Sequence, residues 1–421
     1  MAGKKDDIMV FKKKYILLVI VLIFVCLACV CIRKNEIKKR YFQEDSEKFI
    51  LSEEKKKGFD LPVDRQEREE AENDCKRVME LYRNIYEQAD KGEAANVVLS
   101  DKIILEIQNK VKETGCPVYT MVLHSDMENH NKMNNFLKEC MDGKSGVIVV
   151  YEIHSDGSIG RMKYIYDEMD MYVLSVNADW NKESKPGITY VTYNRIKEWR
   201  YSDKGWFCYK LCVPEYPEVT EMVDGICMIR IKPMTGELRE MTEKCVMGLG
   251  YQGNNLLCSN WDAAHLDRLD YNGMYEYLYA MKYKKKFEAE DYPNGISKEE
   301  FESLIMEYLP ITAQEIQKYA VFDEDNQTYV YAQLGCLNYS PTFFGTSLPE
   351  VTEVKENEDG TVTLTVDAVC DTVICDDTVI THELTVRFAE DGSFRYLGNN
   401  ILNNGIRNIP DYQYRISMRQ S

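Results

Sequence analysis

Histidine is scarce in this sequence: only five histidines stand among the 421 residues, and they are scattered. No two of them have the spacing that places two zinc ligands on one face of a helix. The sequence also lacks the phosphate-binding pattern GxxxxGK[ST], a GxGxxG pattern after a strand, the zinc pattern HExxH and the nucleophile pattern GxSxG. We therefore expect no metal site, no cofactor and no familiar set of catalytic residues.

Basic residues are outnumbered, with 52 Lys and Arg against 70 Asp and Glu and a net charge of −18. The first 40 residues are the exception, because they contain ten basic residues and three acidic ones, a net charge of +7. Residues 41–421 therefore carry a net charge of −25. Nucleic-acid binding depends on basic patches that displace counterions from phosphates. The acidic body therefore argues against a nucleic-acid partner.

One long hydrophobic run is present, YILLVIVLIFVCLACVCI at residues 15–32. A helix of this length rises about 27 Å, close to the hydrocarbon thickness of a bilayer. We predict a permanent single-pass anchor that follows a short basic cytoplasmic tail, residues 1–14. Two alternatives stay open: a secretory signal that is cleaved, and a lipid attached to Cys29. The run is longer than the apolar centre of a cleaved signal and has no small-residue cleavage site, and lipidation at Cys29 is weakened because Cys26 stands where such signals carry Leu.

The orientation of this anchor rests on its flanks. Five basic residues precede the run and five follow it closely, so the positive-inside count is nearly a tie. A short leading tail usually stays in the cytoplasm, and a long following domain is translocated largely regardless of its charge. We therefore expect the membrane as a partner through residues 15–32 and the body outside the cytoplasm.

Periodicity predicts an α+β protein of two domains. Residues 33–70 are dense in charge and read as a stalk. A first domain, 71–213, begins with a helix whose apolar stripe runs from Ala71 to Ala89 and a second helix capped by Ser100, followed by antiparallel strands from Gly146 onward. After a connector at 214–260, a second domain, 261–421, repeats the order of helices followed by a β-meander.

The cysteines do not predict a disulfide framework. Of the 14 cysteines, three lie in the hydrophobic run, and the odd number that remains cannot all pair within one chain. Cys208 and Cys212 share a strand face at a separation too long for a bridge. We expect mostly buried thiols that act as small apolar side chains.

The segment GLGYQGNNLLCSNWD, residues 248–262, is the candidate ligand-binding site. It combines flexible glycines with side chains suited to hydrogen bonding and stacking on a polar ligand: Tyr251, Gln252, Asn254, Asn255, Asn260 and Trp261. An ordered interdomain loop whose asparagines cap the backbone explains the same composition.

Other polar features favour structural roles. His382 has the strand parity of Ile380 and Leu384, which predicts a hydrogen-bonded core histidine rather than a catalytic one. The acidic run Asp323–Asn326 lacks the glycine and the distal glutamate of a calcium loop and is typical of a solvated turn.

Four longer stretches carry a resemblance: KGWFCYKLCVPE, GYQGNNLLCSNWD, YNGMYEYLYAMKY and THELTVRFAEDGSFRYLGNNI. From about Cys75 onward the chain resembles an uncharacterised family of membrane-associated proteins from clostridia-like Gram-positive bacteria. The resemblance implies a cell-envelope setting, and the family has no assigned activity or catalytic residue to carry over to this chain.

These observations lead to two functional hypotheses. The first is a membrane-anchored, non-enzymatic protein that binds a partner protein or a small polar ligand. The alternative is a cell-envelope hydrolase that acts on wall glycan or peptide through paired carboxylates, which must face each other across a cleft. Two converging buried acids would favour the hydrolase, and a groove of tyrosine, asparagine and apolar groups would favour binding.

Overall fold

The computed structural model describes residues 57–92, 96–123, 125–219, 225–342, 344–370 and 378–416. The predicted cytoplasmic tail, the predicted anchor at 15–32, Cys29 and most of the predicted stalk lie outside this part of the chain. Within the described ranges, no helix has both the length and the apolar character needed to cross a membrane.

The first unit, residues 57–230, is built on one seven-stranded sheet whose strands follow the order of the sequence. Strand β1 runs parallel to β2, and every later pair is antiparallel, which confirms the predicted meander. The strands are β1 (Val118–Thr120), β2 (Gly146–Ile153), β3 (Ile159–Tyr166), β4 (Met171–Trp180), β5 (Pro186–Tyr201), β6 (Trp206–Leu211) and β7 (Ile226–Arg230). Two strands predicted within 188–202 are one long strand, β5.

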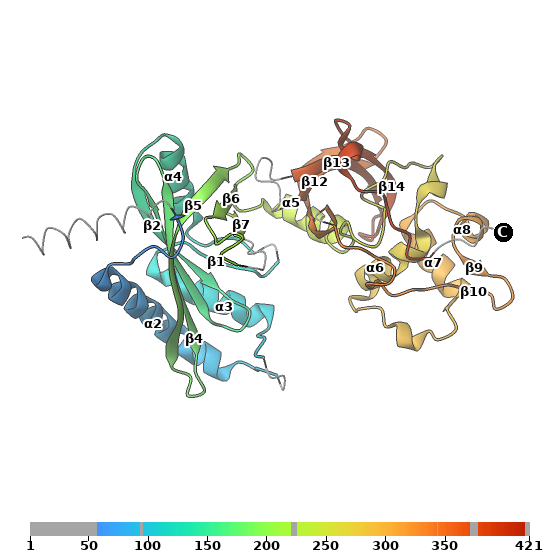
Figure 1. Cartoon of the computed structure of the whole chain (residues 1–421). Helices are drawn as coiled ribbons and strands as arrows, with labels where there is room; N and C mark the ends of the chain where they lie inside the picture. Colours follow the sequence, from blue (N-terminus) through green and yellow to red (C-terminus); the bar gives the residue numbers. More distant parts are fainter. Residues whose placement is uncertain are drawn as a thin grey trace, which may run out of the picture.

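Helices cover both faces of this sheet (Figure 1). Helices α2 (Arg65–Gln88) and α3 (Asp101–Val111) pack on the face that carries Tyr151 and Ile153. Helix α4 (His130–Met141), which the sequence pattern did not reveal, packs on the opposite face against Val150 and Tyr164. Because neighbouring residues of a strand point to opposite faces, strands β2 to β5 contribute side chains to two separate cores.

Helix α2 begins earlier than the sequence pattern predicts. Asp64 caps it by accepting hydrogen bonds from the backbone N–H groups of Gln66 and Glu67, so the helix starts within the predicted stalk. Before the cap, Leu61 is buried and its N–H donates to the carbonyl of Tyr193 on β5 at 2.8 Å. The folded unit therefore extends at least to residue 58, where Gly58 accepts from the N–H of Arg195.

The second unit, residues 236–416, repeats the order of helices followed by an antiparallel meander. Its helices are α5 (Gly236–Met241), which continues as a π-turn (Thr242–Val246), α6 (Tyr271–Tyr283), α7 (Lys298–Tyr308) and α8 (Ala313–Tyr319). Short strands β8 (Ile296–Ser297), β9 (Phe322–Asp323) and β10 (Thr328–Tyr329) form a small sheet. The main sheet contains β11 (Leu348–Glu356), β12 (Val362–Val369), β13 (Thr378–Phe388) and β14 (Phe394–Ile401).

Short 3-10 turns complete the fold at Lys112–Thr114, Leu266–Arg268, Ala289–Asp291, Phe344–Thr346 and Gly405–Asn408. Aromatic stacking organises the helical part of the second core. The ring of Phe301 stacks between those of Tyr275 and Tyr329, with centroid distances of 4.9 and 4.0 Å. Strand β11, absent from the predicted meander, adds the buried Val351 to this core.

The predicted connector, 214–260, divides between the two units: β7 completes the first sheet, while α5 and the segment after it pack in the second. Trp206 and Cys208 of β6 pack against Val369 of β12. Two ion pairs cross the same junction, Lys204 with Asp367 and Arg230 with Glu350. The two units therefore share a packed interface.

Candidate functional site

A cavity of about 660 Å³ opens on the α4 side of the first sheet, at its junction with the second unit. Strands β2 to β7 and the segment that follows β1 form most of its wall. Residues of the second unit, among them Leu348 and Glu350, close one side. A concave site between two packed units, largely apolar and with a few polar groups, is where ligands bind most often.

One row of cavity-facing positions crosses five strands. Glu152 on β2 lies opposite Tyr119 on β1 and Gly160 on β3, and Gly160 lies opposite Asn177 on β4. Asn177 in turn lies opposite Tyr190 on β5. Since laterally paired residues share a sheet face, their side chains converge on one surface of the cavity.

Gly160 has no side chain, and the side chains of its neighbours, Met162 among them, pack over it. A Cβ at this position would lie 3.2 Å from His154 Nε2 and 3.3 Å from Asn177 Oδ1, closer than ordinary van der Waals contact. The missing side chain therefore lets an imidazole and an amide approach the same point above the sheet.

Glu152 is the acidic centre of the row. The hydroxyl of Tyr119 donates a hydrogen bond of 3.0 Å to Glu152 Oε2. Burial, and secondarily the nearby Glu152 charge, raises the pKa of Tyr119 well above its ordinary value, so the phenol stays a donor. His154 Nδ1 lies 3.8 Å from Glu152 Oε1, and its buried Nε2 has no hydrogen-bond partner among the residues that the structure describes.

The rest of the cavity is mostly apolar. Its wall includes Met127, Met162, Val173, Leu211, Ile226 and Ile229. Large apolar side chains also stand exposed among the lining residues: Met121 is 72%, Leu123 51% and Tyr190 53% exposed. Exposed apolar groups gathered around a concavity mark interaction sites more often than plain surface.

An ion pair closes the side of the cavity that faces the second unit. Arg230 of β7 donates to Glu350 of β11, and both side chains are largely buried. The guanidinium also lies over the ring of Trp206, 5.2 Å from its centroid. This contact joins two sheets and forms part of the cavity lining.

The predicted ligand segment, 248–262, lies in the second unit, and its side chains do not line this cavity. Tyr251 is buried and bonds His382 Nε2 at 2.9 Å, while Asn254 donates to the carbonyl of Leu249. Asn255 binds the backbone of residues 268 and 270, Asn260 accepts from the N–H of residue 401, and buried Trp261 donates to the carbonyl of residue 256. Gln252 is half-buried. These bonds favour the backbone-capping explanation, and ligand contact at the segment stays a prediction.

The core histidine fits its predicted role. His382 is fully buried; its Nδ1 contacts Asn399 Oδ1 at 2.6 Å and its Nε2 contacts the Tyr251 hydroxyl. Because Asn399 uses its amide N–H groups on two backbone carbonyls, His382 Nδ1 is the donor and Nε2 the acceptor. Burial lowers the pKa of His382 to about 4.

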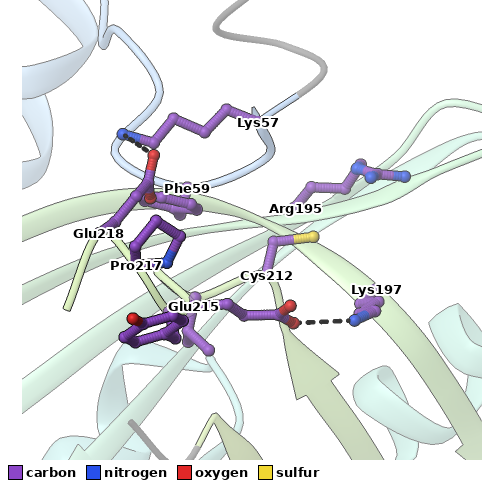
Figure 2. A pocket seen from close by; sticks show the side chains of 10 residues that line it. Lys57, Phe59, Arg195, Lys197, Cys212, Glu215, Pro217 and Glu218 are labelled. Carbon is purple, nitrogen blue, oxygen red and sulfur yellow. Dashed lines mark hydrogen bonds and ion pairs between the residues drawn. The ribbon is translucent and has the colours of Figure 1, made fainter. Parts of the chain in front are cut away.

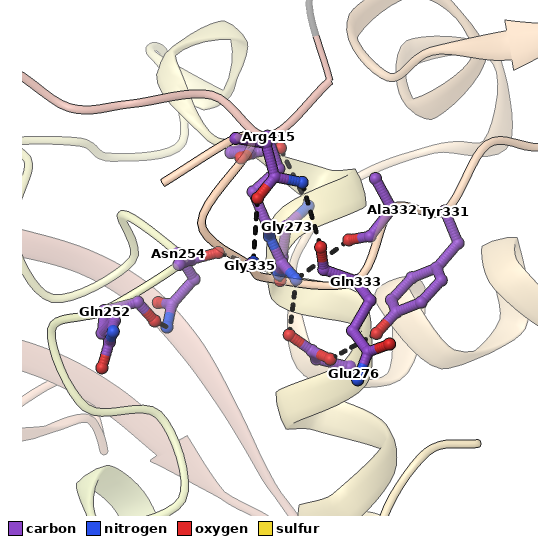
Figure 3. A network of polar contacts seen from close by, with 12 residues as sticks. Gln252, Asn254, Gly273, Glu276, Tyr331, Ala332, Gln333, Gly335 and Arg415 are labelled. Atoms are coloured by element: carbon purple, nitrogen blue, oxygen red, sulfur yellow. Dashed lines mark hydrogen bonds and ion pairs between the residues drawn. The ribbon is translucent and has the colours of Figure 1, made fainter. Parts of the chain in front are cut away.

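Arg415 forms the polar network beside the predicted segment (Figure 3). Its guanidinium donates to Glu276 Oε1 at 2.6 Å and to the carbonyls of Gly253, Gly273 and Ala332. The buried arginine thereby fixes the end of the chain to α6 and to the 248–262 segment. The role of this arginine is structural, because its nitrogens Nη1 and Nη2 already donate to Glu276 and to three backbone carbonyls.

A second cavity of about 420 Å³ lies between the start of the described chain and β5 (Figure 2). Its charged side chains pair across it: Lys57 lies 3.8 Å from Glu218, and Lys197 lies 3.2 Å from Glu215. It is the smaller and more charged of the two cavities, so the cavity on the α4 face is the better candidate.

No sequence pattern singles out Tyr119, Glu152, His154 or Asn177 as a site residue, and His154 stands out only as one of five scattered histidines. The sequence of β4 does indicate a polar face, because Ser175 and Asn177 alternate with the buried Leu174, Val176 and Ala178. Alternation predicts a polar face, but it does not tell a solvated face from the wall of a cavity.

Residues 68–415 match the model of a family described as "Family of unknown function (DUF6070)". The chain belongs to this family. The DUF6070 match spans both units, the cavity and the 248–262 segment, and its description assigns no activity. No curated protein and no solved structure matches the chain.

Proposed function

We propose that this protein is a single-pass, membrane-anchored binding protein whose body lies outside the cytoplasm and whose first unit takes a small, partly apolar ligand. The observation that carries the binding role is the cavity of about 660 Å³ with its polar row at Tyr119, Glu152 and Asn177. The hydrophobic run at 15–32, flanked by basic residues, supports the anchor. Its setting is the envelope of a Gram-positive bacterium, which rests on the resemblance alone.

Binding is favoured over hydrolysis by the chemistry of the lining. Within the described ranges, two acidic residues line the cavity, Glu152 and Glu350, and Glu350 pairs with Arg230. A carboxylate engaged in a largely buried ion pair is poorly suited to act as a nucleophile or as a general base. Hydroxyl, amide, imidazole and apolar side chains form most of the remaining surface, a composition suited to binding a partly apolar ligand.

The binding role is tested by titrating hexanol, an uncharged probe, into the full-length chain in lipid nanodiscs. Calorimetry measures the binding, and the signal from empty nanodiscs is subtracted. Replacing Ser175, which lines the cavity, by Phe is expected to abolish binding because the ring fills the space. The matched control is Thr189→Phe, an exposed position of β5 outside the lining. Hexanol binding that survives Ser175→Phe would contradict the proposal.

The anchor is tested separately. Protease treatment of intact protoplasts is expected to digest the body while a cytoplasmic marker survives. Protection of the body would reverse the proposed orientation. Recovery of the full-length chain from the soluble fraction without detergent would exclude the anchor.

A further inference from the structure

The charges that line the cavity are unbalanced. Among the lining residues that the structure describes, the acidic ones are Glu152 and Glu350, and Arg230 is the basic one. Since Arg230 pairs with Glu350, the groups found beside the Glu152 carboxylate in the described part of the chain are a hydroxyl and an imidazole. A carboxylate next to apolar walls attracts a positively charged group more strongly than it would in open water.

Three hydrogen-bond acceptors gather at this end of the cavity. His154 Nδ1 lies 3.8 Å from Glu152 Oε1, and a neutral imidazole that carries its proton on Nδ1 offers Nε2 as an acceptor. His154 Nε2 and Asn177 Oδ1 both approach the space above Gly160. With Glu152, these groups offer three acceptors to one bound group, and a primary ammonium carries three N–H donors.

We propose that the cavity selects a molecule with a primary amine head and an apolar body. The amine lies at the Glu152 end of the cavity, where it donates to the lining side chains Glu152, His154 and Asn177. The apolar body lies along Met162, Val173 and Ile229 toward the exposed rim at Leu123. This inference rests on the proposed binding function and adds the chemistry of the ligand.

The test compares three probes that share a six-carbon chain and differ in their polar head group: hexylamine, hexanol and hexanoate. Each is titrated into the full-length protein in nanodiscs, with empty nanodiscs subtracted. Hexylamine is expected to bind about tenfold more tightly than hexanol, the difference made by one charge-assisted hydrogen bond, and hexanoate is expected to bind weakest. Hexanoate binding as tightly as hexylamine would overturn the inference.

Variants assign the preference to Glu152. Glu152→Gln is expected to remove the roughly tenfold advantage of hexylamine, so that hexylamine and hexanol bind this variant with affinities within about twofold of each other. The control Glu183→Gln changes an exposed glutamate on the β4–β5 turn and is expected to change neither affinity. An equal loss for both probes in Glu152→Gln would mean that Glu152 has a structural role only, and the inference would fail.

A second variant works in the opposite direction, so the test does not depend on a loss of function. Asn177→Asp adds a carboxylate beside the site and is expected to tighten hexylamine and weaken hexanoate, each by about tenfold. Unchanged affinities would contradict the inference. If none of the three probes binds the wild-type protein, the proposed binding function itself fails, a result distinct from binding without preference for the amine.

Discussion

Tyr119 and Glu152 stand 33 residues apart in the sequence, yet they lie opposite each other across the parallel strands β1 and β2 and are joined by a hydrogen bond of 3.0 Å. Helix α4 provides the crossover that a parallel pair requires. The hydrogen bond therefore depends on the correct docking of α4, and it orients a carboxylate at the end of the cavity.

Removal of this hydroxyl is expected to destabilise the first unit. Tyr119→Phe leaves the largely buried carboxylate without its donor and should lower the free energy of unfolding by about 1–3 kcal/mol, measured by urea titration. The control Tyr190→Phe removes a hydroxyl from an exposed ring in the same row and should cost less than about 0.5 kcal/mol. Equal effects would show that the Tyr119–Glu152 bond contributes nothing specific.

Gly160 is expected to be required for the shape of the site. Gly160→Ala places a methyl group against His154 Nε2 and Asn177 Oδ1, so hexylamine affinity should fall about tenfold through the loss of one hydrogen bond. Gly187→Ala is the matched control on β5, since its Cβ would meet only the Asp179 carbonyl, at 3.9 Å. If Gly160→Ala bound hexylamine with wild-type affinity, the acceptors would not converge as described.

His382 predicts the pH dependence of stability. Its folded pKa of about 4 lies below the ordinary 6.5, because burial disfavours the charged imidazole. The unfolded chain takes up this proton first, so stability is complete above about pH 6.5 and is lost as the pH falls toward 4, by about 3 kcal/mol in total.

Thermal unfolding measured between these pH values should show a steeper decline for the wild type than for His382→Gln, which removes the titrating group. His265→Gln, at an exposed histidine paired with Asp262, serves as the control and should keep the wild-type slope. Parallel slopes for the wild type and His382→Gln would place the pH sensitivity elsewhere.

The ion pair between Arg230 and Glu350 is expected to couple the two units. Breaking it by Glu350→Gln leaves Arg230 without its anionic partner and should cost about 3 kcal/mol. The double variant Arg230→Met with Glu350→Gln should recover much of that loss, since no buried charge is left unpaired. Strictly additive losses in the urea titrations would contradict the coupling.

Sequence patterns were sufficient for the local structure but not for the site. The stripe that contains Ala71, Cys75 and Val78 correctly predicted the buried face of α2, because helix periodicity is a local property. The β2–β3 hairpin and strands β12 and β13 followed from alternation in the same way. The α+β class and the order of helices followed by a meander were therefore accessible from the sequence.

The cavity was not accessible, because it depends on contacts between distant segments. Glu152 and Asn177 share a row only through the register of three strands, and no composition rule fixes that register. Conversely, the composition of the asparagine-rich segment at 248–262 suggested a ligand site. In the structure, the side chains of Asn254 and Asn255 donate hydrogen bonds to nearby backbone carbonyls. Asparagine is suited to both roles, and only the geometry separates them.

The most direct measurement of the central claim is a crystal structure of the protein with bound hexylamine. We expect the amine nitrogen within hydrogen-bond distance of Glu152 and Asn177, with the alkyl chain along Met162 and Val173. Hexylamine bound elsewhere on the molecule, or a cavity filled by collapsed side chains at saturating hexylamine, would contradict the binding role assigned to this face of the sheet.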